Sequence, residues 1–193
     1  MYWTQQDKED PAVVKASMDG SGLEFLKKVG LVQPTSIAFH KNFNLYWVDH
    51  VGRRIEYTNT AGKRPQSFGS LKYAPKRMVI DGDNMYWVGR LKDANSEAIF
   101  TTPLDFHGPK REEEEKYIIS RNLTGITGLC AHDADSRWKI RGNPCEQAKQ
   151  CAGICLLSTK RSFRCACPVG FEPSGTNGSS CTGSLLLPPS VIY

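Results

Sequence analysis

Apolar and polar positions alternate in short runs between residues 34 and 71, and the pattern predicts four β-strands. Successive runs are separated by turn segments that contain Gly or Asn, namely KNFN, HVGR and AGKR. Short strands joined by tight turns form antiparallel meanders. We therefore expect an all-β fold here, with strands over residues 36–40, 45–49, 53–60 and 66–71.

The same pattern recurs along the chain. Tyr-Trp pairs begin at residues 2, 46 and 86, which are 44 and 40 residues apart, and PTSIAFHKNFNLYW from Pro34 matches PKRMVIDGDNMYW from Pro75. A period of about 40 residues with four short strands is typical of β-propeller blades, whose apolar faces are buried by neighbouring blades. We expect the tryptophans of these pairs, Trp3, Trp47 and Trp87, to pack between sheets rather than to form a ligand platform.

The aromatic pairs resemble the signature of a known repeat family. The tetrapeptides YWTQ, YWVD and YWVG are similar to the Tyr-Trp-Thr-Asp motif of the YWTD propellers, or class B repeats, of the LDL receptor and its relatives, and MDGSG at 18–22 is similar to the turn that follows the motif. The resemblance implies that the motif aspartate ties neighbouring blades through backbone amides. Of the three repeats, one keeps this residue, as Asp49; Gln5 is expected to substitute in part, and Gly89 cannot. We therefore expect a weaker blade contact after Gly89.

Six of the seven cysteines crowd into residues 145–181. Such density is typical of a small module that disulfides hold together in an oxidising compartment, because the module has too little apolar material for a core. A zinc site is the alternative, but among these cysteines only Cys151 and Cys155 have the spacing of a thiolate knuckle. The spacing alone leaves the pairing open.

The ending CACPVGF at 165–171 resembles the last part of an EGF-like domain. That resemblance implies three disulfides, Cys145–Cys155, Cys151–Cys165 and Cys167–Cys181. The lead-in KIRGNPCEQ is cationic, whereas a calcium-binding module needs oxygen ligands there, so we expect no metal and no cofactor. The seventh cysteine, Cys130, lies in a segment that resembles the last propeller strand and its run into the EGF module. We expect a buried free thiol, with a mispaired or intermolecular disulfide as the alternative.

These observations predict a partial YWTD-type propeller of about two and a half to three blades over residues 1–141, an EGF-like domain over 142–182 and an unstructured tail over 183–193. The family ring has six blades. The chain also begins without a secretory signal, and its apolar tail is far shorter than the ~20 residues of a membrane span. We therefore expect a fragment of a longer secreted or membrane-anchored protein.

Polar residues in the loops beside the Tyr-Trp strands are candidates for ligand binding, although merely solvated turns have the same composition. The candidates are Lys41, Asn44, His50, Arg53, Arg54 and Arg90. Of the four histidines, His40, His50, His107 and His132, we regard His50 as the best candidate for an endosomal pH switch. Asn122 and Asn177 begin glycosylation sequons. The run Glu112–Glu115 is expected to be a solvated, mobile tip, because its like charges repel; docking of a basic ligand there is the alternative.

The resemblance implies a cell-surface receptor ectodomain, of the LDL-receptor-related kind, that binds extracellular protein ligands for endocytosis or signalling. The alternative is a basement-membrane protein of the nidogen type, which uses the same propeller. A catalytic role would have to use Cys130 with His132 and Asp133, and a buried thiol is not reactive, so we expect no enzyme. The net charge of +5 is dispersed along the chain, so nucleic acid is not an expected partner. Besides extracellular protein ligands, the expected partners are neighbouring blades of the parent chain. We expect any membrane anchor to lie in the missing part of that chain.

Overall fold

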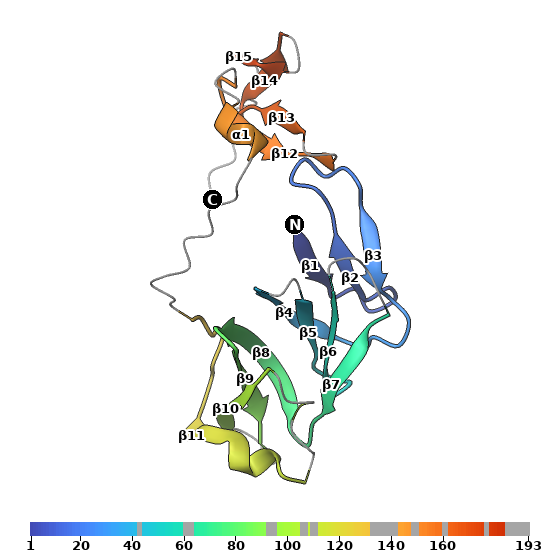
Figure 1. Ribbon diagram of the computed structural model, residues 1–193, viewed down its shortest axis with the longest axis vertical. Helices are drawn as coiled ribbons and strands as arrows, with labels where there is room; N and C mark the ends of the chain where they lie inside the picture. Colours follow the sequence, from blue (N-terminus) through green and yellow to red (C-terminus); the bar gives the residue numbers. More distant parts are fainter. Residues whose placement is uncertain are drawn as a thin grey trace, which may run out of the picture. The chain divides into compact units, whose positions relative to one another are not determined.

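The computed structural model describes residues 1–41, 44–59, 64–91, 96–104, 108, 112–131, 143–147, 151–159, 162–175 and 178–183, and their regular structure is almost entirely β (Figure 1). The expected all-β fold is therefore confirmed. Contacts divide the chain into two compact units. The larger unit comprises Tyr2–Lys15 and Phe25–Arg137, and the smaller one comprises Met1, Ala16–Glu24 and Trp138–Tyr193.

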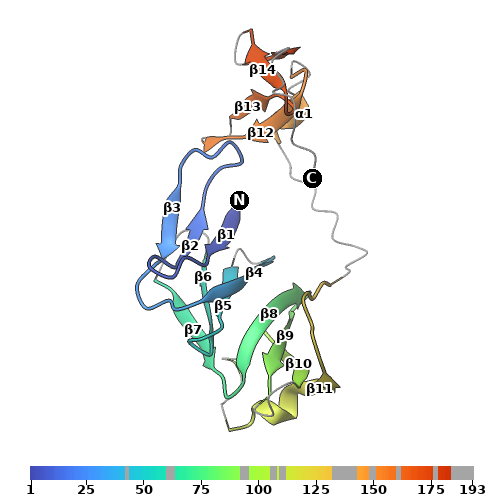
Figure 2. The same ribbon diagram turned by 180° about the vertical axis from the view of Figure 1, so that it is seen from behind.

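The larger unit is built from three antiparallel meanders, which Figures 1 and 2 show from opposite sides. The first sheet has three strands, β1 (Tyr2–Gln5), β2 (Ala12–Lys15) and β3 (Glu24–Lys27). The second has β4 (Pro34–His40), β5 (Asn44–Asp49), β6 (Arg54–Asn59) and β7 (Gln66–Ser70). The third has β8 (Ala74–Asp81), β9 (Asn84–Arg90), β10 (Glu97–Pro103) and β11 (Ile118–Leu123), with a 3-10 turn, η1 (Glu114–Tyr117), before β11.

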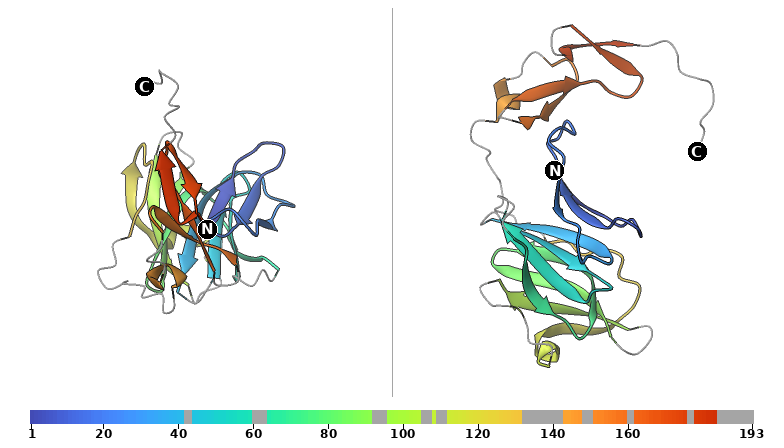
Figure 3. Two further views of the ribbon diagram at one scale, coloured as in Figure 1. Left: turned by 90° about the horizontal axis from the view of Figure 1, so that it is seen from above. Right: turned by 90° about the vertical axis from the view of Figure 1, so that its right-hand side faces the viewer.

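The sheets stack face to face like propeller blades, as the view from above in Figure 3 shows for the described strands. The first strands of the second and third sheets lie side by side: Thr35 Oγ1 donates to the Lys76 carbonyl at 3.0 Å, and Ser36 Oγ accepts the Met78 N–H at 3.1 Å. We refer to the second and third sheets as the second and third blades. Their four strands each follow the order that the repeat predicts.

The tryptophans of the second and third repeats form the centres of the cores. The side chains of Trp47 and Trp87 are both 0% exposed. Trp47 packs with Val13 and Leu31 between the first and second sheets, and Trp87 packs in the core between the second and third. Burying aromatic area of this size is the main source of cohesion between such sheets. Trp47 and Trp87 thus pack between sheets, as the sequence predicts, whereas Trp3 in β1 is only partly buried.

One expectation for this unit is wrong. Cys130, which we expected to be buried in a closing strand, is an exposed free thiol in a segment without strand structure. Within the described residues, 124–131 has no neighbouring strand to pair with, and an unpaired segment leaves its side chains in water. The residues His132 and Asp133 lie outside the described part of the chain.

The smaller unit contains a short helix, α1 (Pro144–Gln147), and two hairpins, β12 (Ile154–Leu157) with β13 (Phe163–Ala166) and β14 (Phe171–Ser174) with β15 (Ser180–Gly183). Three disulfides join Cys145 to Cys155, Cys151 to Cys165 and Cys167 to Cys181. These are the pairs that the EGF-like resemblance implies. Disulfides replace the large apolar core that so small a unit cannot form.

The loop at 16–24 belongs to this smaller unit, although its sequence follows the first propeller motif. The Met18 N–H donates to the Leu157 carbonyl at 2.9 Å, and the hydroxyls of Ser21 and Ser158 lie 3.3 Å apart. The Asp19 carboxylate accepts both the N–H and the hydroxyl of Ser21, at 3.0 and 2.6 Å. The hydrogen bonds from Ser158 and Ser21 lower the pKa of Asp19 to about 2. The MDGSG turn therefore forms part of the contact with the EGF-like hairpin.

Two further expectations fall on residues that are not described. The proposed boundary at 141/142 lies within 132–142, and nearly all of the tail lies within 184–193, so the division into 1–141, 142–182 and 183–193 stays a prediction. Among the described residues, no helix is long and apolar enough to cross a membrane.

Candidate functional site

The turns of the second and third blades gather at two opposite ends of the sheets. One end, which we call the Asp49 end, contains the β5–β6 turn together with the start of β8 and the end of β9. The other, the Asp83 end, contains the β4–β5 and β8–β9 turns. The six predicted ligand-binding residues are therefore not brought together. Lys41 and Asn44 lie at the Asp83 end, whereas His50, Arg53, Arg54 and Arg90 lie at the Asp49 end.

The Asp49 carboxylate is the centre of the hydrogen-bond network at its end. It is fully buried and accepts the N–H groups of Gln33 at 2.9 Å, Val32 at 3.3 Å and Gly52 at 3.2 Å. The Arg54 guanidinium donates to it at 2.8 Å and also bonds the Gly30 carbonyl. A buried carboxylate needs this number of donors to offset its lost hydration. Asp49 thus fixes both the β5–β6 turn and the connection that leads into β4.

The predicted ligand-binding residues at this end differ in how far they are engaged. His50 Nδ1 lies 2.7 Å from the Pro75 carbonyl, so the imidazole ties the β5–β6 turn of the second blade to the start of the third. Arg54 is held by Asp49. By contrast, the side chains of Arg53 and Arg90 are exposed. The Arg53 backbone has φ of 50°, a left-handed conformation that only the turn geometry makes tolerable for such a residue. Residues 92–95 of the loop after Arg90 are not described.

The glutamate run contains a residue that the sequence interpretation placed wrongly. Glu114, expected in a solvated tip, is 0% exposed. Its Oε2 accepts the N–H of Lys72 at 2.5 Å and that of Tyr73 at 3.4 Å. Burial raises the pKa of Glu114, whereas these N–H groups act to lower it. The carboxyl group can be buried because the connection between β7 and β8 provides two backbone N–H groups as hydrogen-bond donors. Without Glu114, these N–H groups would need water as their acceptor.

Its neighbour Glu115 is exposed and behaves as a surface carboxylate. It pairs with the Lys72 ammonium at 2.6 Å and accepts the Tyr73 hydroxyl at 2.8 Å. The Lys72 ammonium, followed by the Tyr73 hydroxyl, lowers the pKa of Glu115. The two adjacent glutamates thus have pKa values shifted in opposite directions, because one is buried and the other is paired in water.

A third carboxylate at the Asp49 end, Glu97, was also missed. It is 4% exposed, binds Lys76 Nζ at 2.9 Å and accepts the Ile126 N–H at 2.7 Å. Burial is the largest influence on its pKa and acts to raise it, but Lys76 and the Ile126 N–H outweigh burial, so the pKa of Glu97 is lowered. Three different connections of the fold are therefore fixed by hydrogen bonds from their backbone N–H groups to a buried carboxyl group, that of Asp49, Glu97 or Glu114.

The Asp83 end contains a pocket of about 380 Å³ between the two blades. His40, which is 4% exposed, places Nε2 at 3.2 Å from Asp83 Oδ1, and Lys41 Nζ lies 2.9 Å from Oδ2. Lys41 and then His40 lower the pKa of the exposed Asp83 carboxyl group. The described lining residues are His40, Asn44, Tyr46, Asp83, Asn84, Pro103 and Leu104. The charged side chains of this pocket pair with one another. The groups that remain to contact a bound molecule are amides, a phenol and apolar side chains.

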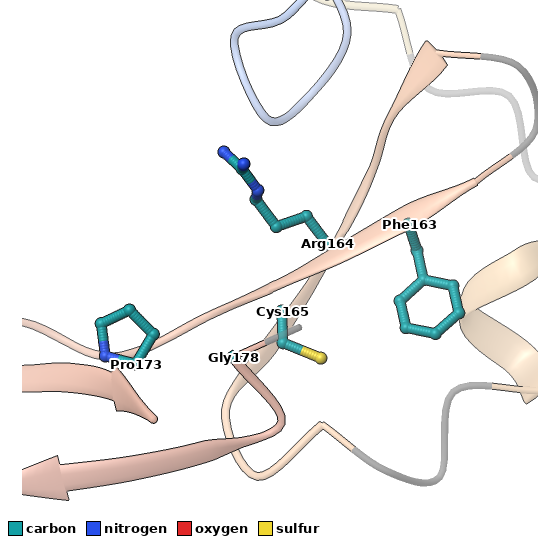
Figure 4. A pocket seen from close by; sticks show the side chains of 5 residues that line it. All are labelled: Phe163, Arg164, Cys165, Pro173 and Gly178. Carbon is teal, nitrogen blue, oxygen red and sulfur yellow. The ribbon is translucent and has the colours of Figure 1, made fainter. Parts of the chain in front are cut away.

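A second pocket, of about 440 Å³, lies inside the smaller unit (Figure 4). Its described lining is Phe163, Arg164, Cys165, Pro173 and Gly178. Figure 4 shows that Phe163 and Arg164 project from opposite sides of β13, as successive strand residues do. Arg164 is the one charged side chain among these, and Cys165 is in a disulfide. The described lining thus contains no nucleophile paired with a base.

Among the described residues, no group of three or more His, Cys, Asp or Glu side chains is arranged to hold a metal ion. The buried carboxyl groups at the Asp49 end are occupied by backbone N–H groups and cations. What the described surface offers is a pair of rigid turn clusters with exposed polar side chains. Loops that a rigid scaffold positions in this way are common sites of contact with a partner.

Comparison with curated proteins shows which known proteins the chain resembles in sequence. The chain is 26% identical over 172 residues to low-density lipoprotein receptor-related protein 5 of Mus musculus, a match that covers 88% of this chain and 10% of that protein. It is 25% identical over 175 residues to the vitellogenin receptor of Solenopsis invicta, which covers 88% of this chain and 9% of that one. The chain is thus similar to these receptors over most of its length. It spans about a tenth of the length of these curated relatives.

A solved structure supports the fold assignment. A chain of a crystal structure of a nidogen/laminin complex matches with a TM-score of 0.52 and 21% sequence identity, over 66% of this chain and 45% of that one. At this identity the likeness shows the fold alone. No model of a protein family matches the sequence. The predicted YWTD-type propeller with a disulfide-rich EGF-like module is therefore confirmed as the architecture.

Proposed function

We propose that the chain is part of the extracellular region of an LDL receptor-related cell-surface receptor and presents a rigid surface to protein ligands. The observation that carries this proposal is the similarity to two kinds of receptor over 88% of the chain. The three disulfides require an oxidising compartment and support an extracellular location. A nidogen-type structural role shares the fold, and the relatives found by sequence do not favour it.

This proposal is tested by labelling the natural full-length protein on intact cells. A membrane-impermeant biotin reagent and an antibody against the blades should both reach the protein without permeabilisation. Labelling that requires permeabilised cells would overturn an extracellular location.

We propose that the Asp49 end is the ligand-binding face. Its turns are fixed by Asp49, Glu97 and Glu114, so that exposed Arg53 and Arg90 lie on a pre-ordered backbone. Pre-ordering reduces the entropy lost on binding. At the Asp83 end, by contrast, Lys41 is neutralised by Asp83. We assign no ligand contact to Lys41 and Asn44, and we assign to His50 and Arg54 the support of the turn that carries Arg53.

The two ends can be compared directly with a photo-crosslinking residue in the complete chain. The residue replaces Arg53 in one sample and exposed Asn84, at the opposite end, in the matched control. After exposure to culture medium and irradiation, specific crosslinked bands are expected with the Arg53 sample and not with the Asn84 sample. Bands from the Asn84 sample alone would assign the ligand face to the other end.

We also propose that Asn122 is glycosylated. It is exposed in β11 with φ of 59°, a left-handed conformation that Asn tolerates better than most residues. Removing N-glycans enzymatically should lower the apparent mass of the wild type, and the shift should be reduced in Asn122→Gln. An unchanged shift in that variant would exclude Asn122. The other sequon residue, Asn177, lies outside the described residues.

A further inference from the structure

The second blade uses two carboxylates around its motif tryptophan. Asp49 accepts the N–H groups of Val32 and Gln33, in the connection that enters β4. Glu56, directly opposite Trp47 on β6, accepts the indole N–H at 3.0 Å. One carboxylate therefore satisfies the connection and the other satisfies the tryptophan.

The third blade has lost both of these residues. The repeat places Gly89 where the second blade has Asp49, and the residue opposite Trp87 is Phe100 rather than a glutamate. The Phe100 ring stacks on the Trp87 indole with centroids 5.2 Å apart and planes 10° apart. A Cβ atom added at Gly89 would lie 2.8 Å from Phe100 Cε2. The ring thus occupies the space that an aspartate side chain at position 89 would need.

In the third blade, a carboxyl group from a different element, Glu114, binds the backbone of the connection before the blade. It lies at the start of η1, and its Oε2 binds Lys72 and Tyr73 in the connection that enters β8, one residue further from the repeat proline than in the second blade. Glu114 does not reproduce the contact of Glu56 with the motif tryptophan. Trp87 Nε1 and Glu114 Oε1 are both buried without a hydrogen-bond partner among the described residues.

We propose that Glu114 replaces the missing motif aspartate of the third blade. The carboxyl group of Glu114 with the N–H groups of Lys72 and Tyr73 forms a carboxyl latch between η1 and the blade connection. This latch revises the expectation of a weak blade contact after Gly89. At the other degenerate repeat, the Gln5 side chain donates to the Asp10 carbonyl at 3.2 Å and thus binds within its own turn.

The latch is tested by amide hydrogen exchange in the complete chain, because exchange reports each connection separately. Glu114→Ala should accelerate exchange at Lys72 and Tyr73 by about tenfold or more, the effect of losing a buried acceptor, and leave Val32 and Gln33 unchanged. Asp49→Ala should have the reverse effect. Glu112→Ala, in the same acidic run but exposed, is the matched control and should alter neither pair.

The Glu114→Gln variant keeps the test decisive if the alanine variant does not fold. Its side-chain oxygen retains one acceptor, so exchange at Lys72 and Tyr73 should lie between that of the wild type and that of a fully exposed amide. The proposal is overturned if these two amides exchange at the wild-type rate in a folded Glu114→Ala or Glu114→Gln chain. It is also overturned if Glu112→Ala accelerates them equally.

Discussion

The carboxyl group of Glu114 accepts the backbone N–H of Lys72 at 2.5 Å, across 42 residues of chain. This contact joins the segment before β11 to the connection before β8, and it lies in the blade whose motif ends in Gly89. Its counterpart in the second blade is the bond from the Gln33 N–H to Asp49. The two blades therefore satisfy the same kind of connection with carboxyl groups from different elements.

Gly89 should not accept a side chain. In Gly89→Ala the new methyl group would meet the Phe100 ring at 2.8 Å and Tyr73 Cβ at 3.4 Å. Overpacking of this kind in a core costs about 1–3 kcal/mol. Gly128→Ala is the control, because an added Cβ there has no neighbour within 4 Å, and its effect should stay within about 0.5 kcal/mol. Urea unfolding measures both. Equal stability of the two variants would contradict the tight packing described for Phe100.

The charge of Asp49 should matter far more than that of Asp83. Asp49 is 0% exposed and pairs with Arg54, so Asp49→Asn leaves that guanidinium without its counter-charge. Breaking a buried pair typically costs 3–5 kcal/mol, and the partial exposure of Arg54 puts the expected loss at about 2–3 kcal/mol. Asp83, whose side chain is 70% exposed, pairs with Lys41. Asp83→Asn should therefore change the free energy of unfolding far less than Asp49→Asn, because water screens an exposed ion pair. Similar losses from both variants in chemical denaturation would be incompatible with this account.

Glu114 should make the chain less stable as the pH rises. Burial raises its pKa in the folded state above the usual value of 4.5, at which it titrates when unfolded. Between these two pKa values the folded state holds a proton that the unfolded state has released, so stability falls as the pH rises through this window. The Lys72 ammonium is the charged group that acts on Glu114, and the pKa of the adjacent Glu115 is shifted in the opposite direction.

The measurement is the free energy of unfolding of the wild type and Glu114→Gln from pH 4 to pH 7. The variant should gain stability relative to the wild type as the pH rises, and Glu112→Gln should track the wild type throughout. A relative loss for Glu114→Gln with rising pH would show that the folded-state pKa is lowered instead.

Cys130 should react with thiol reagents without denaturation. It is an exposed thiol, whereas the other six cysteines are in disulfides. A maleimide should modify the native, non-reduced chain once, and Cys130→Ser should remove this modification without a change in thermal stability. Absence of labelling in the native state, followed by labelling in urea, would restore the original expectation of a buried thiol.

The sequence predicts much of this fold because the informative residues act locally. The run from Pro34 and its copy from Pro75 have the alternation and turns of β4–β5 and β8–β9, and the cysteine spacing around CACPVGF matches a known disulfide pattern. Trp47 and Trp87 are buried in the cores, as their place in apolar strands implies. Each of these inferences depends on neighbours within a few residues along the chain or on a resemblance of whole motifs.

Glu114 and Glu97 could not be found in the same way. Each binds a backbone N–H at least 29 residues distant, and an N–H donor leaves no trace in the sequence. The four glutamates at 112–115 are identical by residue type, so charge repulsion was the one local signal available. A stronger signal was the absence of a carboxylate at Gly89, which left two buried donors to be satisfied from elsewhere. Cys130 was misjudged for a related reason, because an apolar segment becomes a buried strand only when a neighbouring strand pairs with it.

The central claim is that the chain belongs to a receptor rather than to a structural component of the matrix. Antibody uptake tests this most directly: living cells that express the natural full-length protein are labelled on ice with an antibody against the blades and then warmed. A receptor of the proposed kind should carry the antibody into acidified vesicles, protected from an acid wash and from extracellular protease. Antibody that stays in a detergent-resistant extracellular deposit, with none inside the cell, would contradict the receptor assignment and favour the nidogen-type role.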